Sequence, residues 1–117
     1  MNNKNKELNQ ILPKLKNANK ECNSELAEIS LYADYEGNNE MSIDKYGTIV
    51  GKISGGLNGC GKWSDYFLVL SSLIKILEEK YNVKAWLIKM ENDCIDDIFY
   101  GEFGFEIIKP SKEIDPA

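Results

Sequence analysis

The sequence predicts an α+β fold, with a single, mainly antiparallel sheet of four to five strands packed on one long core helix and with a helix at the N-terminus. Three observations lead to this prediction. Apolar residues recur at helical spacing in the first part of the chain and again over residues 64–81. Between these segments, and after the second one, apolar and polar residues alternate with a period of two, as in half-buried strands. Short turns rich in glycine and asparagine separate the first strands, which is typical of an antiparallel meander.

The N-terminal helix is expected from about residue 7 to about residue 24, with an apolar stripe along one face. Pro13 interrupts this stripe, so the helix either kinks there or begins near residue 12 with Pro13 in its first turn. The stripe continues on both sides of Pro13, which favours the kink. Residues 1–6 are rich in Asn and Lys, and we expect them to be frayed.

The meander should contain three strands, at residues 29–35, 41–43 and 48–54. A flexible glycine-rich loop is expected to follow at residues 55–61. The core helix comes next, because Ser64 is a good N-cap and an apolar stripe then runs as far as Tyr81.

A fourth strand is predicted over residues 83–90, with Trp86, Ile88 and Met90 on one face. The segment after it has two interpretations. Either residues 93–103 form a short helix that precedes a strand, or residues 98–108 form one long strand in a hairpin with the fourth.

Composition excludes many kinds of catalysis, because the chain has no histidine and all 14 of its basic residues are lysine. The absence of histidine excludes Ser-His-Asp and Cys-His catalysis and the HExxH and C2H2 zinc patterns. The absence of arginine excludes bidentate clamps on phosphate or carboxylate and arginine fingers. Carboxylates, lysines, tyrosines, cysteines and backbone amides remain for polar chemistry.

The charge of the chain is unevenly distributed. Residues 1–24 carry five lysines against two glutamates, a net charge of +3, whereas residues 25–117 carry nine lysines against 17 acids, a net charge of −8. We treat residues 1–117 as a single domain whose acidic body favours a basic protein partner and repels nucleic acids and anionic membranes. Three cysteines without a CxxC pair and the lack of a long apolar run favour a cytoplasmic protein.

The C-terminal part of the chain contains a run of acids with no lysine between them, next to two aromatic residues. Such a run is either a solvated edge or turn, or a surface that binds a basic partner through charge and aromatic anchors. A calcium loop is disfavoured because the D-x-[DN]-x-[DN]-G spacing is absent. The predicted partner-binding residues are Glu91, Asp93, Asp96, Asp97, Phe99, Tyr100, Glu102 and Glu106.

Glycines precede the core helix in the segment Gly59-Cys60-Gly61-Lys62. Backbone amides at such a position can bind a phosphate, but the segment lacks the hydroxyl residue of a Walker A loop, and a mobile connecting loop is the alternative. Cys60 is expected to be an unremarkable thiol, because no histidine is present to activate it. Cys22 is expected to be a small core residue.

Residues 59–108 resemble the C-terminal half of GNAT acetyltransferases, in the order GxG loop, helix, strand, Asn92-Asp93, and Tyr100 four residues before Gly104-Phe105. The resemblance implies that Gly59, Gly61 and Lys62 face the pyrophosphate of acetyl-CoA and that Tyr100 protonates the departing thiolate. The sequence departs from the family pattern at Gly56, where the family has Gln or Arg, and at Asp96, where it has a small alanine.

Two functions follow from these observations. The first is a small acidic interaction or inhibitor protein, of the toxin-immunity or anti-defence type, which masks a basic surface of a macromolecular partner and uses neither catalytic residues nor a cofactor. The alternative is a compact GNAT-like N-acetyltransferase that uses acetyl-CoA. A helix at residues 93–103 favours the enzyme, and an unbroken strand at residues 98–108 favours the interaction protein.

Overall fold

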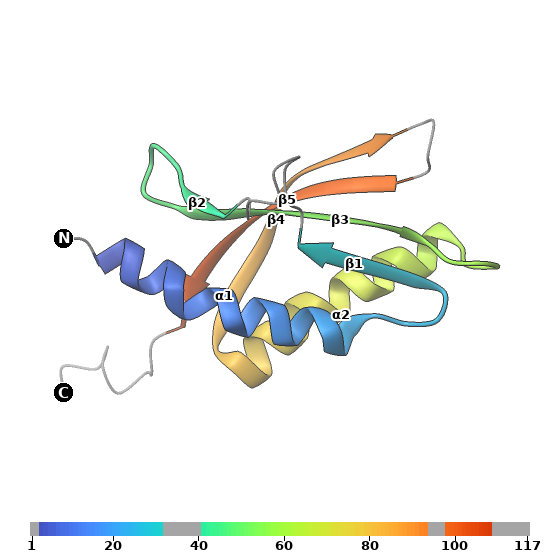
Figure 1. Cartoon of the computed structure of the whole chain (residues 1–117), viewed down its shortest axis with the longest axis horizontal. Coiled ribbons are helices and arrows are strands. Elements are labelled where there is room, and N and C mark those ends of the chain that lie inside the picture. Colours follow the sequence, from blue (N-terminus) through green and yellow to red (C-terminus); the bar gives the residue numbers. More distant parts are fainter. Residues whose placement is uncertain (1–2, 32–40, 94–97, 109–117) are drawn as a thin grey trace.

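The computed structural model describes residues 3–31, 41–93 and 98–108, and it confirms the α+β prediction. In these residues two helices and five strands follow one another (Figure 1). In order they are α1 (Asn3–Cys22), β1 (Ala27–Leu31), β2 (Ser42–Ile43), β3 (Ile49–Leu57), α2 (Trp63–Tyr81), β4 (Val83–Asp93) and β5 (Ile98–Ile107).

The strands form one antiparallel sheet in the order β1-β3-β5-β4, and β2 also pairs with β3. Since β3 and β4 are both antiparallel to β5, they run parallel to each other with β5 between them. The first three strands do not form a simple meander, because β1 and β2 both pair with β3. Strand β1 pairs along residues 53–57 and β2 pairs along residues 49–50. The nine residues of β3 are long enough to accommodate both of these short strands.

The predicted loop at residues 55–61 begins too early, because β3 continues through Gly55 and Gly56 to Leu57. The absence of a side chain at Gly55 makes this possible. A Cβ atom there would overlap the Glu28 carbonyl oxygen and the side chains of Ile29 and Tyr66. Glycine thus lets β1 and α2 pack closely against β3, a role that its usual preference for loops conceals.

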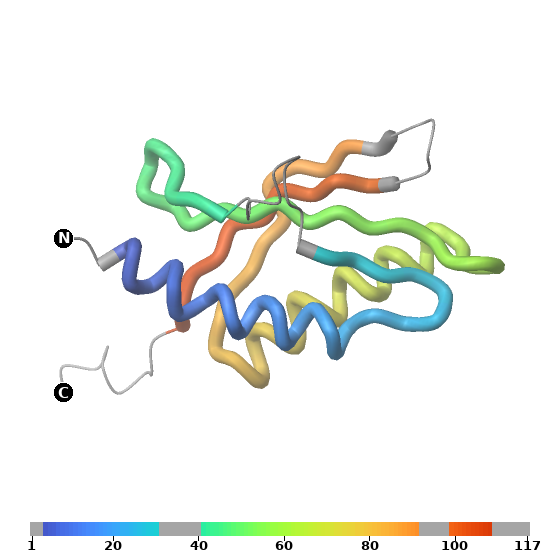
Figure 2. Tube along the Cα trace, in the orientation of Figure 1, coloured from blue at the N-terminus to red at the C-terminus, as the bar shows by residue number. Residues whose placement is uncertain are grey.

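Both helices lie on one face of the sheet, which we call the inner face, and the core lies between them and the sheet (Figures 1 and 2). Alternate residues of the strands point into this core. The largest fully buried side chains are Ile11, Leu15, Ile29, Ile49, Ile53, Tyr66, Leu73, Leu77, Val83, Phe103 and Phe105. No helix in the described part of the chain is long and apolar enough to span a membrane.

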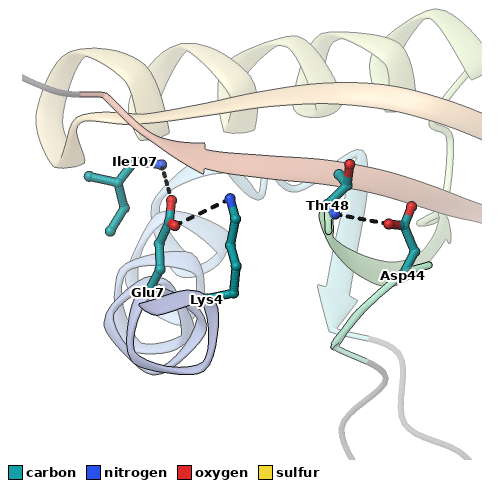
Figure 3. Close-up of polar contacts among 5 residues, drawn as sticks. All are labelled: Lys4, Glu7, Asp44, Thr48 and Ile107. Atoms are coloured by element: carbon teal, nitrogen blue, oxygen red, sulfur yellow. Dashed lines mark hydrogen bonds and ion pairs between the residues drawn. The ribbon is translucent and has the colours of Figure 1, made fainter. Parts of the chain in front are cut away.

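Helix α1 starts at Asn3, so residues 3–6 are helical rather than frayed, and it runs without interruption through Pro13. The alternative of a helix beginning near residue 12 is wrong. The N-terminal part of α1 is held to β5 by Glu7, which pairs with Lys4 at 3.5 Å and accepts a hydrogen bond from the Ile107 backbone N–H at 3.1 Å (Figure 3). Figure 3 also shows Asp44 in the turn after β2, where its carboxylate accepts the Thr48 N–H at 2.8 Å.

Helix α2 begins at Trp63, and its N-cap is Lys62 rather than the predicted Ser64. The Asp65 carboxylate accepts the Lys62 backbone N–H at 2.7 Å, which satisfies a donor that the helix leaves unpaired. The helix ends at Tyr81 as predicted, and Asn82 adopts the left-handed conformation of a C-cap with φ of 58°.

The last segment is a hairpin. Strand β5 runs unbroken from Ile98 to Ile107 beside β4, so the described residues of the predicted 93–103 helix are strand. A bulge between Leu87 and Lys89 shifts the alternation of β4 by one residue. For this reason Trp86 and Met90 point to opposite faces of the sheet, in contrast to the single face predicted for them.

Candidate functional site

The face of the sheet away from the helices, which we call the outer face, carries most of the predicted site residues that the structure describes. Paired residues of neighbouring strands point to the same face. On the outer face Glu102 of β5 pairs with Lys52 of β3 on one side and with Lys89 of β4 on the other. Tyr100 is the next outer-face residue of β5, and it lies between Ser54 and Glu91.

These side chains surround an open hollow of about 300 Å³. Its lining residues are Lys52, Lys89, Glu91, Tyr100, Gly101 and Glu102. Lys89 and Glu91 form an ion pair of 3.2 Å in which both side chains remain more than half exposed, at 62% and 63%. The hollow therefore offers two carboxylates, two ammonium groups and a phenol to a side chain from outside, with solvent screening each charge.

The acidic run is not free of lysine in three dimensions. Lys52 and Lys89 flank Glu102, and Lys84 pairs with Glu106 further along the same face. The sequence separates these lysines from the acids, but the register of the sheet interleaves them. Self-repulsion within the run is therefore much weaker than the sequence implies.

One end of the outer face keeps an acidic character. Glu28 of β1 pairs with Gly56, and Asp93 of β4 pairs with Ile98, in the row of the sheet next to the β4–β5 connection. Glu91 lies in the following row. Among the described residues, these two rows contain no lysine, whereas Lys52, Lys84 and Lys89 all lie further from that connection. Asp96 and Asp97, two further predicted partner-binding residues, lie outside the described residues.

Phe99 belongs to the other face. Its ring lies 4.3 Å from that of Trp63, 5.1 Å from that of Tyr66 and 5.7 Å from that of Phe67, measured between centroids. These contacts place Phe99 in an aromatic cluster that joins the start of α2 to β5, and the side chain is half-buried. Phe99 and Tyr100 therefore cannot anchor one partner together, because adjacent residues of a strand point to opposite faces.

The glycine loop before α2 is held by bonds within the chain. The Gly61 N–H donates to the Asn58 carbonyl oxygen at 2.8 Å, and the Lys62 N–H donates to Asp65. Two of the amides that a pyrophosphate would need thus already have acceptors, and one acceptor is a carboxylate that would repel it. Gly61 also packs so closely on the Leu26 carbonyl oxygen that a Cβ atom would overlap it, and Gly59 has a φ of +50°. Close packing and backbone conformation account for both glycines.

The cysteines that the structure describes differ in their surroundings. Cys22 is buried on α1, as predicted for a core residue, and burial raises the pKa of its thiol to about 11. Cys60 is exposed in the loop before α2. Within the described residues, no three cysteine or acidic side chains come together in a group that could hold a metal ion.

Sequence reasoning missed Lys52 and Lys89 as part of the site. Both lysines are distant from Glu102 in the sequence, and only the strand register brings them beside it. The comparison of the chain with protein-family models, curated proteins and solved structures found no match.

Proposed function

We propose that this chain is a small interaction protein that masks a basic surface of a macromolecular partner through the outer face of its sheet, in the manner of a toxin-immunity protein or an anti-defence inhibitor. One observation supports this proposal above all. Both helices pack on the inner face, and no described element covers the outer face of β3, β5 and β4. That face presents Tyr100 between the carboxylates of Glu91 and Glu102 around a hollow.

The charge pattern suggests how a partner would be oriented. Basic groups of the partner would lie over Glu28 and Glu91, at the end of the outer face nearest the β4–β5 connection. Acidic groups at the border of the basic surface would lie over Lys52 and Lys89. Complementary charges of this kind accelerate association and fix the orientation, and each exposed pair contributes only about 0.2–1 kcal/mol.

Tyr100 would carry more of the affinity than any single charge. A tyrosine ring offers a large contact area with few rotatable bonds, and aromatic residues at the centre of an interface are frequent hot spots. Tyr100 is half-buried in the free chain, and its backbone is fixed in the middle of the sheet by two flanking strands. Little backbone entropy is therefore lost when a partner closes over it.

The acetyltransferase alternative has less support from the geometry. Tyr100 lies within a regular strand of a hairpin, and the pattern that favours the enzyme is a helix in this segment. The loop that would bind the pyrophosphate has its Gly61 and Lys62 amides bonded within the chain. An experiment on the proposal should nevertheless include acetyl-CoA, so that the two functions are distinguished.

The test is a calorimetric titration of the full chain with an oligolysine peptide, with an oligoglutamate peptide and with acetyl-CoA. We expect oligolysine to bind in a salt-sensitive manner, and Glu91→Gln to weaken it by about 1.4- to 5-fold, which corresponds to one exposed ion pair. Glu102→Gln should weaken it less, because Lys52 and Lys89 flank Glu102. Glu78→Gln, at an exposed position of α2, is the matched control and should change nothing.

Equal weakening by all three variants, or none by any, would refute the assignment of the outer face. Binding of acetyl-CoA in the micromolar range, together with loss of acetyl transfer in Tyr100→Phe, would instead support the enzyme. Backbone NMR shifts on titration with oligolysine provide an independent map, and they should concentrate in β4 and β5 rather than in α2.

A further inference from the structure

Strand β4 forms a long open edge of the sheet. It has eleven residues, and within the described part of the chain its strand partner is β5 alone. The opposite edge is different, because the Asn23 side chain occupies the backbone groups of Ile29 in β1. Its Oδ1 accepts the Ile29 N–H at 2.8 Å, and its Nδ2 donates to the Ile29 carbonyl oxygen at 3.1 Å. An uncovered edge strand is a template for pairing with another strand.

Two exposed apolar side chains lie in the middle of this edge. Leu87 is 45% exposed and Ile88 is 46% exposed, and they occupy the bulge of β4. Lys84 and Lys89 are also on this strand, and lysine on an edge strand ordinarily discourages pairing. Pairing is therefore favourable only with a strand that places an acidic or aromatic group opposite each lysine.

The bulge gives β4 an unusual symmetry. In a regular strand, residues 84 and 91 point to opposite faces, because side chains alternate. The extra residue at the bulge brings Lys84, Trp86, Lys89 and Glu91 all to the outer face, as their pairing with alternate residues of β5 shows. If two β4 strands pair antiparallel about a two-fold axis between residues 87 and 88, each of these outer-face residues lies opposite an outer-face residue of the other strand. Matching faces also means that the backbone donors and acceptors of the two strands point toward each other.

We infer that two copies of this chain pair through antiparallel β4 strands about such an axis, which joins their sheets into one. Lys84 of each copy then faces Glu91 of the other, which gives two ion pairs. Trp86 faces Lys89 of the other copy, which gives two cation–π contacts. Leu87 and Ile88 meet their counterparts at the centre and lose their exposure to water.

The charge pattern specifies this register. Moving one β4 strand to the next register that matches the faces would place Trp86 opposite the Glu91 carboxylate of the other copy, and the electron-rich face of an aromatic ring repels an anion. The same arrangement explains why two lysines are tolerated on an open edge. A contact along one strand is smaller than a standard protein interface, so we expect a dimer that forms at micromolar or higher concentrations.

The test is the mass of the full chain, measured by sedimentation velocity and light scattering from about 1 μM to about 1 mM. The expected result is a shift from 13.3 kDa toward twice that mass with rising concentration. Lys84→Glu and Glu91→Lys should each raise the dissociation constant about tenfold or more, because two attractive pairs become repulsive. The double variant should restore the original constant, and Lys75→Glu on α2 serves as the control.

A single-chain mass at every concentration would overturn the inference. A dimer that the single charge reversals leave unchanged, or that Lys75→Glu weakens equally, would overturn it as well. Circular dichroism of each variant checks that the fold is retained, and recovery in the double variant could not occur if the single variants were simply misfolded. The outcome is independent of the proposed function, because no partner is present in the measurement.

Discussion

The contact between Trp86 and Gly104 predicts that the effect of Gly104→Ala on stability depends on whether Trp86 is present. The two residues pair across β4 and β5 on the outer face, and a Cβ atom at Gly104 would overlap the indole ring. Gly104→Ala should therefore force the ring away from its site, and overpacking of this kind destabilises a protein by about 1–3 kcal/mol. At a urea dependence of about 2 kcal/mol per M, the midpoint of unfolding should fall by about 0.5–1.5 M.

The same substitution should act differently once the ring is removed. In the Trp86→Ala background, alanine at position 104 meets no indole, and glycine within a strand is about 0.5–1 kcal/mol worse than alanine. Gly104→Ala should then leave the stability unchanged or raise it. Urea unfolding followed by circular dichroism measures all four proteins of this double-mutant cycle without relying on tryptophan fluorescence. If Gly104→Ala destabilises both backgrounds equally, the contact with Trp86 is not the reason that glycine is needed there.

Three further predictions concern the core and two titrating groups. Leu73→Ala, at a fully buried position of α2, should lower the free energy of unfolding by about 2–5 kcal/mol, and a loss below 1 kcal/mol in urea titration would contradict its central place in the core. Glu21 accepts hydrogen bonds from Lys80 at 2.9 Å and Tyr81 at 2.6 Å, which lower the pKa of its carboxyl below its ordinary value. Its contribution to stability should therefore be present at neutral pH and lost as the pH falls through that lowered pKa. Thermal scans should show wild type and Glu21→Gln converging in acid. Burial raises the pKa of the Cys22 thiol from 9.0 to about 11, so between these values the folded state keeps a proton that the unfolded state loses. The free energy of unfolding should therefore fall as the pH rises from 9 to 11. Cys22→Ala should show a smaller fall over the same range.

The elements that the sequence predicted well are those with a strong local signal. Helix α2 has an apolar stripe and an αL-prone asparagine at its end, and both are visible in a few adjacent residues. The extension of α1 back to Asn3 was not visible, because it depends on Glu7 reaching the backbone of Ile107 far along the chain. Gly55 resembles a loop residue for the same reason, since the tight packing that requires glycine there comes from β1 and α2.

The candidate site was harder to predict than the fold, because it depends on strand register. The sequence indicated Glu91, Tyr100 and Glu102, and the structure brings them together around one hollow. Phe99 was assigned to the same surface, although alternation within a strand sends it to the other face. Whether residues 98–108 alternate as a strand could not be decided from their aromatic run, since either secondary structure would bury part of it.

The position of β5 has a consequence for the synthesis of this protein. Among the strands that the structure describes it is the last in sequence order, and it lies between β3 and β4 in the sheet. Fifty residues separate the end of β3 at Leu57 from the end of β5 at Ile107, so a ribosome that adds about 5–20 residues per second needs about 3–10 s to make them. During that interval β3 has no neighbour on the side that β5 will occupy. A nascent chain of this protein therefore exposes two unpaired strand edges until β5 inserts between them.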